Sequence, residues 1–261
     1  MFTNNPFAAL TDVLPANAMQ IYVVLMVLAV FAGTLFDIIH KGSAKYFFEN
    51  WRRSNNKGAQ RVGSGEMASI AIKTGLVDVL TSGEFCSARR RVAHLLTMYG
   101  FVIYVLTTAS MVFGYATPAT PTPSMVPLLW WIGGLMVCAG GYWFWFFIRV
   151  DVAAEGNSPL RIVRADLFIL SLLSSVTLGL IWAYLQTSAS SGAMVFFGLY
   201  ILATTVLFGS VPWSKFAHMF FKPAAAFEKR VSYANGTRSN LPAPADKPEV
   251  FGSAREQPRH Y

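Results

Sequence analysis

The stretch QIYVVLMVLAVFAGTLFDII, residues 20–39, decides the class of fold, because Asp37 is its only charged residue. A run of about 20 apolar residues can cross the roughly 30 Å hydrocarbon core of a bilayer as a helix. Four similar runs follow, at about residues 94–116, 126–150, 165–186 and 192–211. Since a backbone in lipid must satisfy its own hydrogen bonds, all five runs should be helical. The sequence therefore predicts an all-α integral membrane protein, a bundle of five transmembrane helices.

The composition also favours a membrane protein. The chain is 54% hydrophobic and 13% charged, with a mean hydropathy of +0.44, whereas a soluble domain carries about 25% charged residues. Residues 1–19 contain no Lys or Arg, so they lack the basic start of a secretory signal peptide and the first run should be retained. Cys86 and Cys138 share no metal-ligand spacing, and we expect two unpaired thiols.

The positive charges predict the orientation of the bundle. All 21 Lys and Arg residues fall in three stretches, at residues 41–91, 149–164 and 215–259. The loops at residues 117–125 and 187–191 have none. By the positive-inside rule, the N-terminus is outside and the C-terminus is cytoplasmic. The basic residues that give the net charge of +8 are therefore expected to face anionic lipid or a cytoplasmic partner. The charge does not require nucleic acid as a ligand.

The expected organisation has three parts: an outer N-terminal segment (1–19), a membrane domain (20–231) and a flexible cytoplasmic tail (232–261). The tail is rich in Pro, Gly and Ala and lacks apolar periodicity. The membrane domain includes a long inner loop at residues 41–91. Within this loop, GEMASIAIKTGLVDVL (65–80) carries a moderate apolar stripe. The stripe suits the inner leaflet, a partner, or packing under the bundle, and the periodicity does not separate these alternatives.

Three histidines lie near the predicted cytoplasmic boundary. His40 ends the first run, His94 opens the second and His218 follows the fifth. His94 and His218 are expected on different helices at similar depth, which is what ligation of a haem by two imidazoles requires. Three nearby cations could pair with haem propionates: Arg91, Lys215 and Lys222. An interfacial histidine is often only an anchor, so this alternative stays open, and His40 is the weaker ligand candidate.

Other classes of function find little support. The runs carry no mid-depth Lys, Arg or Glu, which a transporter or proton pump would normally need. The chain has no nucleophile–base set, P-loop or metal-binding motif, and no catalytic residue is assigned. The pair Trp130 and Trp131 is expected to belong to an aromatic belt at the outer membrane interface, with a quinone or haem pocket as the alternative.

Two segments carry a resemblance to a known family: PWSKFAHMFFKPAAAF (212–227) and RRRVAHLLTMYGFVIYVLTT (89–108). Both are similar to segments around the haem-ligating histidines of membrane cytochrome b subunits related to the gamma subunit of respiratory nitrate reductase. These relatives include membrane subunits of the quinone-interacting oxidoreductase, sulfite-reductase-linked and heterodisulfide reductase complexes. The similarity covers most of residues 20–228. Among relatives of this size, the chain resembles the membrane anchor of adenylylsulfate reductase.

The resemblance implies that His94 and His218 are the axial ligands of one b-type haem near the cytoplasmic face. Relatives with two haems carry a second histidine pair farther out on the same helices, where this chain has Tyr104 and Tyr200. We therefore expect a single haem.

The resemblance also implies a redox partner. Two cysteines cannot hold an iron–sulfur cluster, so a cytoplasmic flavin/iron–sulfur oxidoreductase, such as adenylylsulfate reductase, would dock on the basic inner face. The chain would then exchange electrons between that enzyme and quinone in a bacterial or archaeal cytoplasmic membrane. The alternative is a haem-free anchor that recruits the soluble enzyme and shapes a quinone site.

Overall fold

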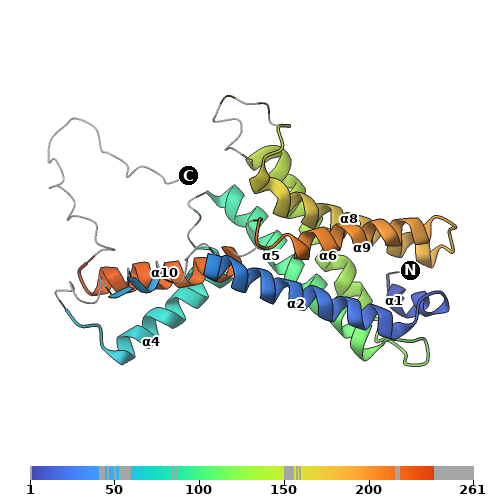
Figure 1. Cartoon of the computed structure of the whole chain (residues 1–261), viewed down its shortest axis with the longest axis horizontal. Coiled ribbons are helices and arrows are strands. Elements are labelled where there is room, and N and C mark those ends of the chain that lie inside the picture. Colours follow the sequence, from blue (N-terminus) through green and yellow to red (C-terminus); the bar gives the residue numbers. More distant parts are fainter. Residues whose placement is uncertain are drawn as a thin grey trace. The chain divides into compact units, whose positions relative to one another are not determined.

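The structure is a computed structural model that describes residues 2–40, 45, 47–49, 51–52, 60–83, 85, 87–149, 156, 158, 160–214 and 218–237. Within these ranges every regular element is a helix (Figure 1). The chain divides into two units. The first contains Met1–Phe36 and Val92–Phe216, and the second contains Asp37–Arg91 and Ala217–Tyr261.

The helices of the bundle are, in chain order, α1 (Pro6–Ala9), α2 (Ala16–His40), α5 (Ala88–Ala109), α6 (Met125–Trp143), α8 (Leu167–Thr187) and α9 (Ala193–Gly209). Short 3₁₀ turns, η1 (Leu10–Asp12) and η5 (Arg164–Asp166), precede α2 and α8. π-Helical turns, η3 (Ser110–Gly114) and η4 (Phe144–Ile148), extend α5 and α6. The last turn of α2 and the first turn of α5 belong to the second unit.

Four of these helices are long and apolar enough to cross a membrane: Ala16–His40, Ala88–Gly114, Met125–Ile148 and Arg164–Thr187. The prediction of an all-α fold is confirmed for the described residues, and the length and composition of these four helices support a multi-pass membrane protein. The fifth apolar helix, α9, has 17 residues, which at 1.5 Å per residue gives about 26 Å, slightly less than the hydrocarbon core. The fifth span and the orientation therefore stay predictions.

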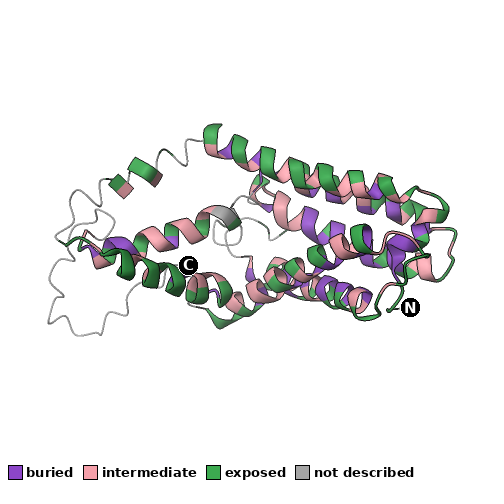
Figure 2. Cartoon of the chain, turned by 90° about the horizontal axis from the view of Figure 1, so that it is seen from below, coloured by how far each residue is buried: buried purple, intermediate pink, exposed green. Residues whose placement is uncertain are grey.

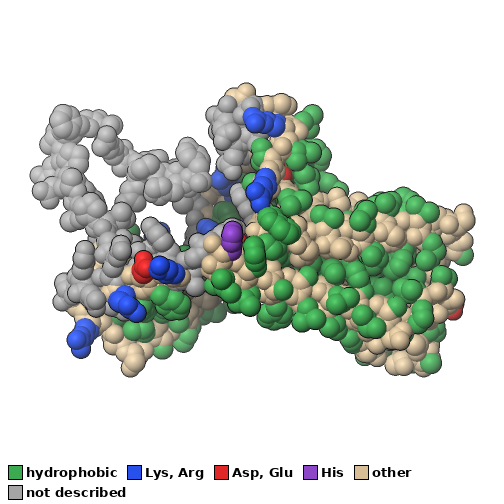
Figure 3. Space-filling view, in the orientation of Figure 1, with side chains coloured by type: hydrophobic (Ala, Val, Ile, Leu, Met, Phe, Trp, Pro, Cys, Tyr) green, Lys and Arg blue, Asp and Glu red, His purple; other side chains and the backbone are tan. Residues whose placement is uncertain are grey.

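Exposed apolar side chains line the outside of α2. Its large hydrophobic residues are half or more exposed at several positions, including Leu25, Leu28, Phe31 and Leu35. Figure 2 shows buried residues where helices of the bundle face one another, and Figure 3 shows hydrophobic side chains over much of the face in view. An apolar surface of this extent fits lipid and does not fit water.

Glycines let α6 pack closely against two helices at once. A Cβ on Gly133 or Gly140 would lie 2.9 or 2.6 Å from carbonyl oxygens of α5. A Cβ on Gly134 or Gly141 would lie 2.8 or 2.6 Å from leucine side chains of α8. Residues seven apart share a helix face, so each pair serves one neighbour. Small residues at helix contacts are typical of membrane bundles, where backbones approach closely.

Side-chain hydrogen bonds join α9 to two neighbours. The hydroxyls of Ser175 on α8 and Thr204 on α9 lie 2.7 Å apart and are both buried. The hydroxyl of Tyr22 on α2 donates to the carbonyl oxygen of Ile201 at 3.0 Å. These contacts make α9 an integral part of the bundle.

The N-terminal segment closes one end of the bundle. The side-chain oxygen of Asn5 caps α1 by accepting from the amides of Phe7 and Ala8, and its amide donates to Tyr115 O at 2.9 Å. Phe7 and Leu10 are 3% and 1% exposed. The N-terminal segment therefore forms a folded cap, which the sequence did not specify.

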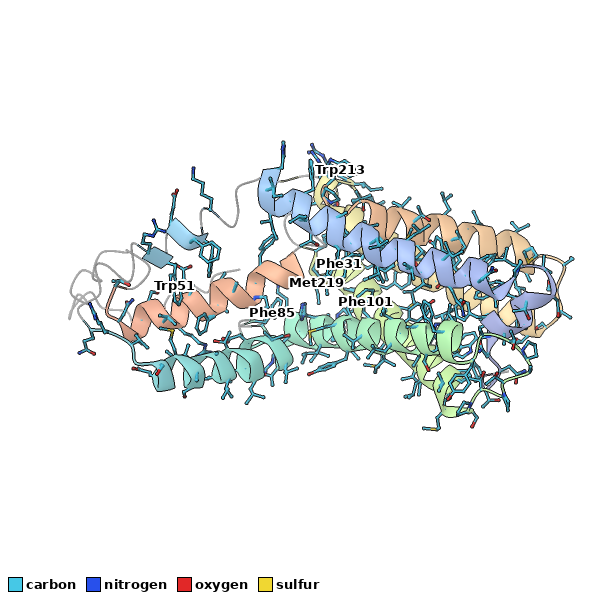
Figure 4. All side chains as sticks on the ribbon, turned by 60° about the horizontal axis from the view of Figure 1, so that its bottom comes forward. Phe31, Trp51, Phe85, Phe101, Trp213 and Met219 are labelled. Carbon is cyan, nitrogen blue, oxygen red and sulfur yellow. The ribbon has the colours of Figure 1, made fainter. Side chains whose placement is uncertain are left out.

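The second unit is a helical assembly of its own. It contains α4 (Ser64–Lys73), its π-helical continuation η2 (Thr74–Leu80) and α10 (His218–Ala234). The Arg230 guanidinium of α10 donates two hydrogen bonds to the Asp78 carboxylate of η2, at 2.6 and 2.9 Å. Trp51 stacks on Phe227 of α10 with ring centroids 5.7 Å apart (Figure 4).

The second unit also contains the start of the predicted tail. Ser232 and Asn235 are 0% and 2% exposed, and the backbone amide of Gln60 donates to Asn235 O at 3.4 Å. The folded part therefore extends past residue 231, and residues 238–261 of the tail lie outside the described residues.

Candidate functional site

His94 lies in the second turn of α5 and is half-buried. The preceding residue, Ala93, is 1% exposed, and its carbonyl oxygen faces Gly140 of α6. His94 therefore stands beside the packed face of α5, partly shielded from solvent. The basic residues Arg89, Arg90 and Arg91 form the turn before it.

His218 is the first residue of α10. α9 ends at Gly209, and the amides of Trp213 and Ser214 both donate to the carbonyl of Ser210 at 2.9 Å. The fifth apolar helix therefore ends before Pro212, and His218 begins a separate helix. This histidine belongs to the second unit and His94 to the first, so their pairing stays a prediction.

The predicted propionate partners have different settings. Lys222 is exposed on α10, while Lys215 lies outside the described residues. The Arg91 Nε donates to the carbonyl oxygen of Thr81 at 2.7 Å. Arg91 thus holds the end of η2 near the first turn of α5, in addition to any contact with an anion.

The other histidine at this boundary, His40, is the last residue of α2 and is exposed. Among the described residues, no three His, Cys, Asp or Glu side chains gather as a metal site. This finding applies to metal sites built from three or more protein ligands. It does not bear on a haem, which needs only two axial ligands.

Tyr104 and Tyr200 meet in the core of the first unit. Both are 5% exposed, although they come from α5 and α9. A Cβ on Gly179 of α8 would lie 2.5 Å from the Tyr104 hydroxyl and 3.0 Å from the Tyr200 ring. The structure therefore brings together the two positions at which two-haem relatives were predicted to hold their outer ligands.

Aromatic rings surround these tyrosines and form what we call the aromatic core cluster: Phe7, Tyr104, Trp130, Trp182, Phe197 and Tyr200. Trp130 stacks on Tyr104 with centroids 4.8 Å apart, and Trp182 stacks on Tyr200 at 5.7 Å. Phe7 of the N-terminal cap contacts both tryptophans edge-on. The outer positions are thus occupied by closely packed side chains.

The aromatic belt prediction is wrong for the tryptophan pair. Trp130 is 0% exposed and Trp131 is 7% exposed, and the Trp130 indole donates to the Thr108 hydroxyl at 2.9 Å. The Gly133 and Gly140 face of α6 packs on α5, and Trp130 lies on this side. An apolar pattern alone did not separate a core-facing tryptophan from a lipid-facing one.

Two polar atoms of the cluster make no hydrogen bond of normal geometry within the described part of the chain: the Tyr104 hydroxyl, whose nearest polar neighbour is the Tyr200 side chain, and the Trp182 indole nitrogen. Burial of an unpaired polar group costs about 1–3 kcal/mol. Their burial must therefore be offset by the ring packing around them.

An ion pair missed by sequence reasoning joins α6 to α8. Arg149, just after η4, contacts the carboxylate of Asp166, and the side chains are only 6% and 10% exposed. The same carboxylate accepts from the Val163 amide at 2.8 Å, and the guanidinium lies 4.0 Å from the centre of the Trp145 ring. The sequence signal for this ion pair was the position of Arg149 at the end of one apolar run and of Asp166 at the start of the next.

The described cations of the first unit are all on the connection from α6 to α8: Arg149, Arg161 and Arg164. The only charged side chain of its N-terminal cap, among the described residues, is the acidic Asp12.

Compared with protein-family models, with curated protein sequences and with solved structures, the chain gives no significant match. The cytochrome b resemblance therefore stays a prediction from the two histidine segments.

Proposed function

We propose that this chain is a membrane electron-transfer subunit that binds one b-type haem through His94 and His218. It would link a cytoplasmic flavin/iron–sulfur oxidoreductase, such as adenylylsulfate reductase, to membrane quinone. The observation that carries the proposal is the pair of family-like segments, each of which has its histidine near the start of a helix. Basic residues flank both histidines.

The donor set fits the chemistry of one haem. Imidazole nitrogens are common axial ligands, and burial of the site is one determinant of a haem's reduction potential. His94 is half-buried beside a packed helix face, while Arg89, Arg90 and Lys222 offer cations for carboxylates. A bound haem would supply a one-electron carrier, and the chain would supply its ligands and its electrostatic surroundings.

The packed outer half of the bundle supports a single haem. Tyr104 and Tyr200 contact Gly179, and rings of Trp130 and Trp182 stack on them. A macrocycle at this level would have to displace several buried rings.

The proposal includes five spans with the N-terminus outside and the C-terminus in the cytoplasm of a bacterium or archaeon. Two observations support it. α9 is hydrogen-bonded to both α8 and α2, which makes it part of the bundle. The described cations of the first unit lie on one connection, as the positive-inside rule expects for a cytoplasmic side.

The test is a reduced-minus-oxidised optical spectrum of the full chain, purified from cells with ample haem. We expect b-type Soret and alpha bands, which should be lost in His94→Ala and in His218→Ala. His40→Ala is the matched control, since His40 lies at the same predicted boundary and is exposed, and it should keep the bands. Full haem content in His94→Ala would refute the ligand assignment. A colourless wild-type protein that still holds a soluble enzyme at the membrane would establish the haem-free anchor instead.

A further inference from the structure

The helix formed by α4 and η2 has two different faces. One face packs on α10, and its members are buried or half-buried: Met67, Ile70, Thr74 and Asp78. The opposite face carries three exposed aliphatic side chains, because Ile72, Leu76 and Leu80 are 63%, 54% and 47% exposed. Residues four apart lie on one side of a helix, so the three form a row, which we call the aliphatic row.

The aliphatic row borders a shallow, open depression. Its lining includes small residues of α4 such as Gly65 and Ala68, together with Ile72 and Leu76. Single exposed apolar residues are ordinary, but a contiguous apolar row marks a surface that contacts something less polar than water. Since α10 already covers the other side of this helix, the occupant of the aliphatic row is not α10.

The end of the aliphatic row is held close to the start of a membrane helix. η2 ends at Leu80, and the next residue, Thr81, accepts a hydrogen bond from the Arg91 Nε at 2.7 Å. Arg91 lies in the first turn of α5, where the membrane-length helix Ala88–Gly114 begins. Thr81, the residue after Leu80, is therefore in direct contact with the first turn of that helix. The lipid around the start of this membrane helix is therefore the apolar environment that the aliphatic row can contact.

The charges near the aliphatic row suit a headgroup region. Lys73 is exposed next to Ile72, and Arg89 is exposed in the first turn of α5. The nearest carboxylate of η2, Asp78, is engaged by Arg230. The acidic residue of α4, Glu66, stands about two turns before Lys73. Cations beside an apolar helix face are typical of helices that lie in the interface of a membrane with anionic lipids.

We propose that the α4–η2 helix is an interfacial helix, with its aliphatic row inserted about 5–10 Å into the boundary between lipid headgroups and acyl chains. The row then positions α10, which carries His218, at the membrane surface. This inference rests on the membrane class of the chain and not on haem binding, so either can fail without the other.

The test places single spin labels on the full chain in nanodiscs of phosphatidylglycerol and phosphatidylcholine. Cys86→Ser and Cys138→Ser remove the native thiols, and labels are then attached in Ile72→Cys or Leu76→Cys. Ala71→Cys is the matched control, since Ala71 is an exposed neighbour that lies on another side of the same helix. At positions 72 and 76, collisions with lipid-soluble oxygen should exceed collisions with a water-soluble nickel complex, and at position 71 the order should be reversed.

Two results would overturn the proposal. A label at position 72 or 76 that meets the nickel complex more often than oxygen lies in water. A label shielded from both reagents lies against protein, which would make the aliphatic row a contact with another chain. In a second variant, Ile72→Glu with Leu76→Glu, a label at Leu80→Cys should lose its preference for oxygen, and an unchanged preference would contradict lipid insertion. Both replaced side chains are exposed, so the fold should persist.

Discussion

The two halves of α5 differ in character, although both were predicted from one apolar run. Near its start, His94 is half-buried and follows three arginines. Farther along, Tyr104 is 5% exposed, contacts Gly179 and is stacked by Trp130. The first region has a candidate haem ligand and cations, while the second has rings that contact one another. The comparison teaches that one helix can combine a candidate binding end with a closely packed structural half.

The largest expected effect tests the packed half. Trp182→Ala should lower the free energy of unfolding by about 3–5 kcal/mol, because it removes a fully buried indole from the aromatic core cluster. Denaturant unfolding in detergent micelles measures it. Trp213→Ala is the control, since Trp213 is 57% exposed (Figure 4) and should change stability by about 0.5 kcal/mol or less. Equal losses in the two variants would mean that the cluster is not the rigid core described above.

The second effect concerns the unit that holds His218. Asp78→Asn should destabilise the packing of η2 on α10 by about 1.5–3 kcal/mol, since it weakens two charge-assisted hydrogen bonds to Arg230. Hydrogen exchange of the α10 amides should then accelerate. Glu66→Gln, at an exposed position on α4, should leave the exchange unchanged. If α10 exchanged at the same rate in Asp78→Asn, the ion pair would not hold this helix.

A third change probes the contact between the tyrosines. Gly179→Ala should cost about 1–3 kcal/mol, because the new Cβ would lie 2.5 Å from the Tyr104 hydroxyl. Gly198→Ala on α9 adds a Cβ with no described atom within 4 Å. It should be neutral or stabilise by about 0.5–1 kcal/mol, as alanine favours helix. Thermal unfolding of the two variants side by side checks this, and a stable Gly179→Ala would show that the tyrosines can separate.

The smallest effect compares two hydroxyls. Tyr22→Phe should cost about 0.5–1.5 kcal/mol, because it removes the hydrogen bond to the Ile201 carbonyl. Tyr104→Phe should be neutral or slightly stabilising, because this buried hydroxyl makes no hydrogen bond of normal geometry with the described residues. Unfolding curves in one detergent are sufficient to rank them. A larger loss for Tyr104→Phe would show that its hydroxyl is hydrogen-bonded in the membrane.

Local pattern predicted the helices but not their partners. The apolar runs gave the membrane class, because length and hydropathy are local properties. The pairing of Asp78 with Arg230 joins residues 152 positions apart, and nothing in either segment specifies the other. Trp130 was assigned to the surface because lipid and protein cores are equally apolar. The glycines at positions 133, 134, 140 and 141 were an available signal for the buried faces of α6.

The candidate site was predictable only in part. The sequence indicated both histidine segments, and the structure gives each a helical setting. It also adds what no motif suggested, namely the closely packed aromatic core cluster around Tyr104 and Tyr200. Tyr104 and Tyr200 were identified only through the resemblance, at the positions where two-haem relatives carry a second histidine pair, whereas their contact with Gly179 depends on how three helices pack.

The most direct test of the central claim is the number of haem groups per chain, measured by extracting haem as its pyridine complex and quantifying the protein by amino-acid analysis. The account predicts one haem per chain in the wild-type protein and in His40→Ala, and none in His94→Ala or His218→Ala. A wild-type chain without haem would contradict the ligand pair. Two haems per chain would contradict the close packing of the aromatic core cluster around Tyr104 and Tyr200.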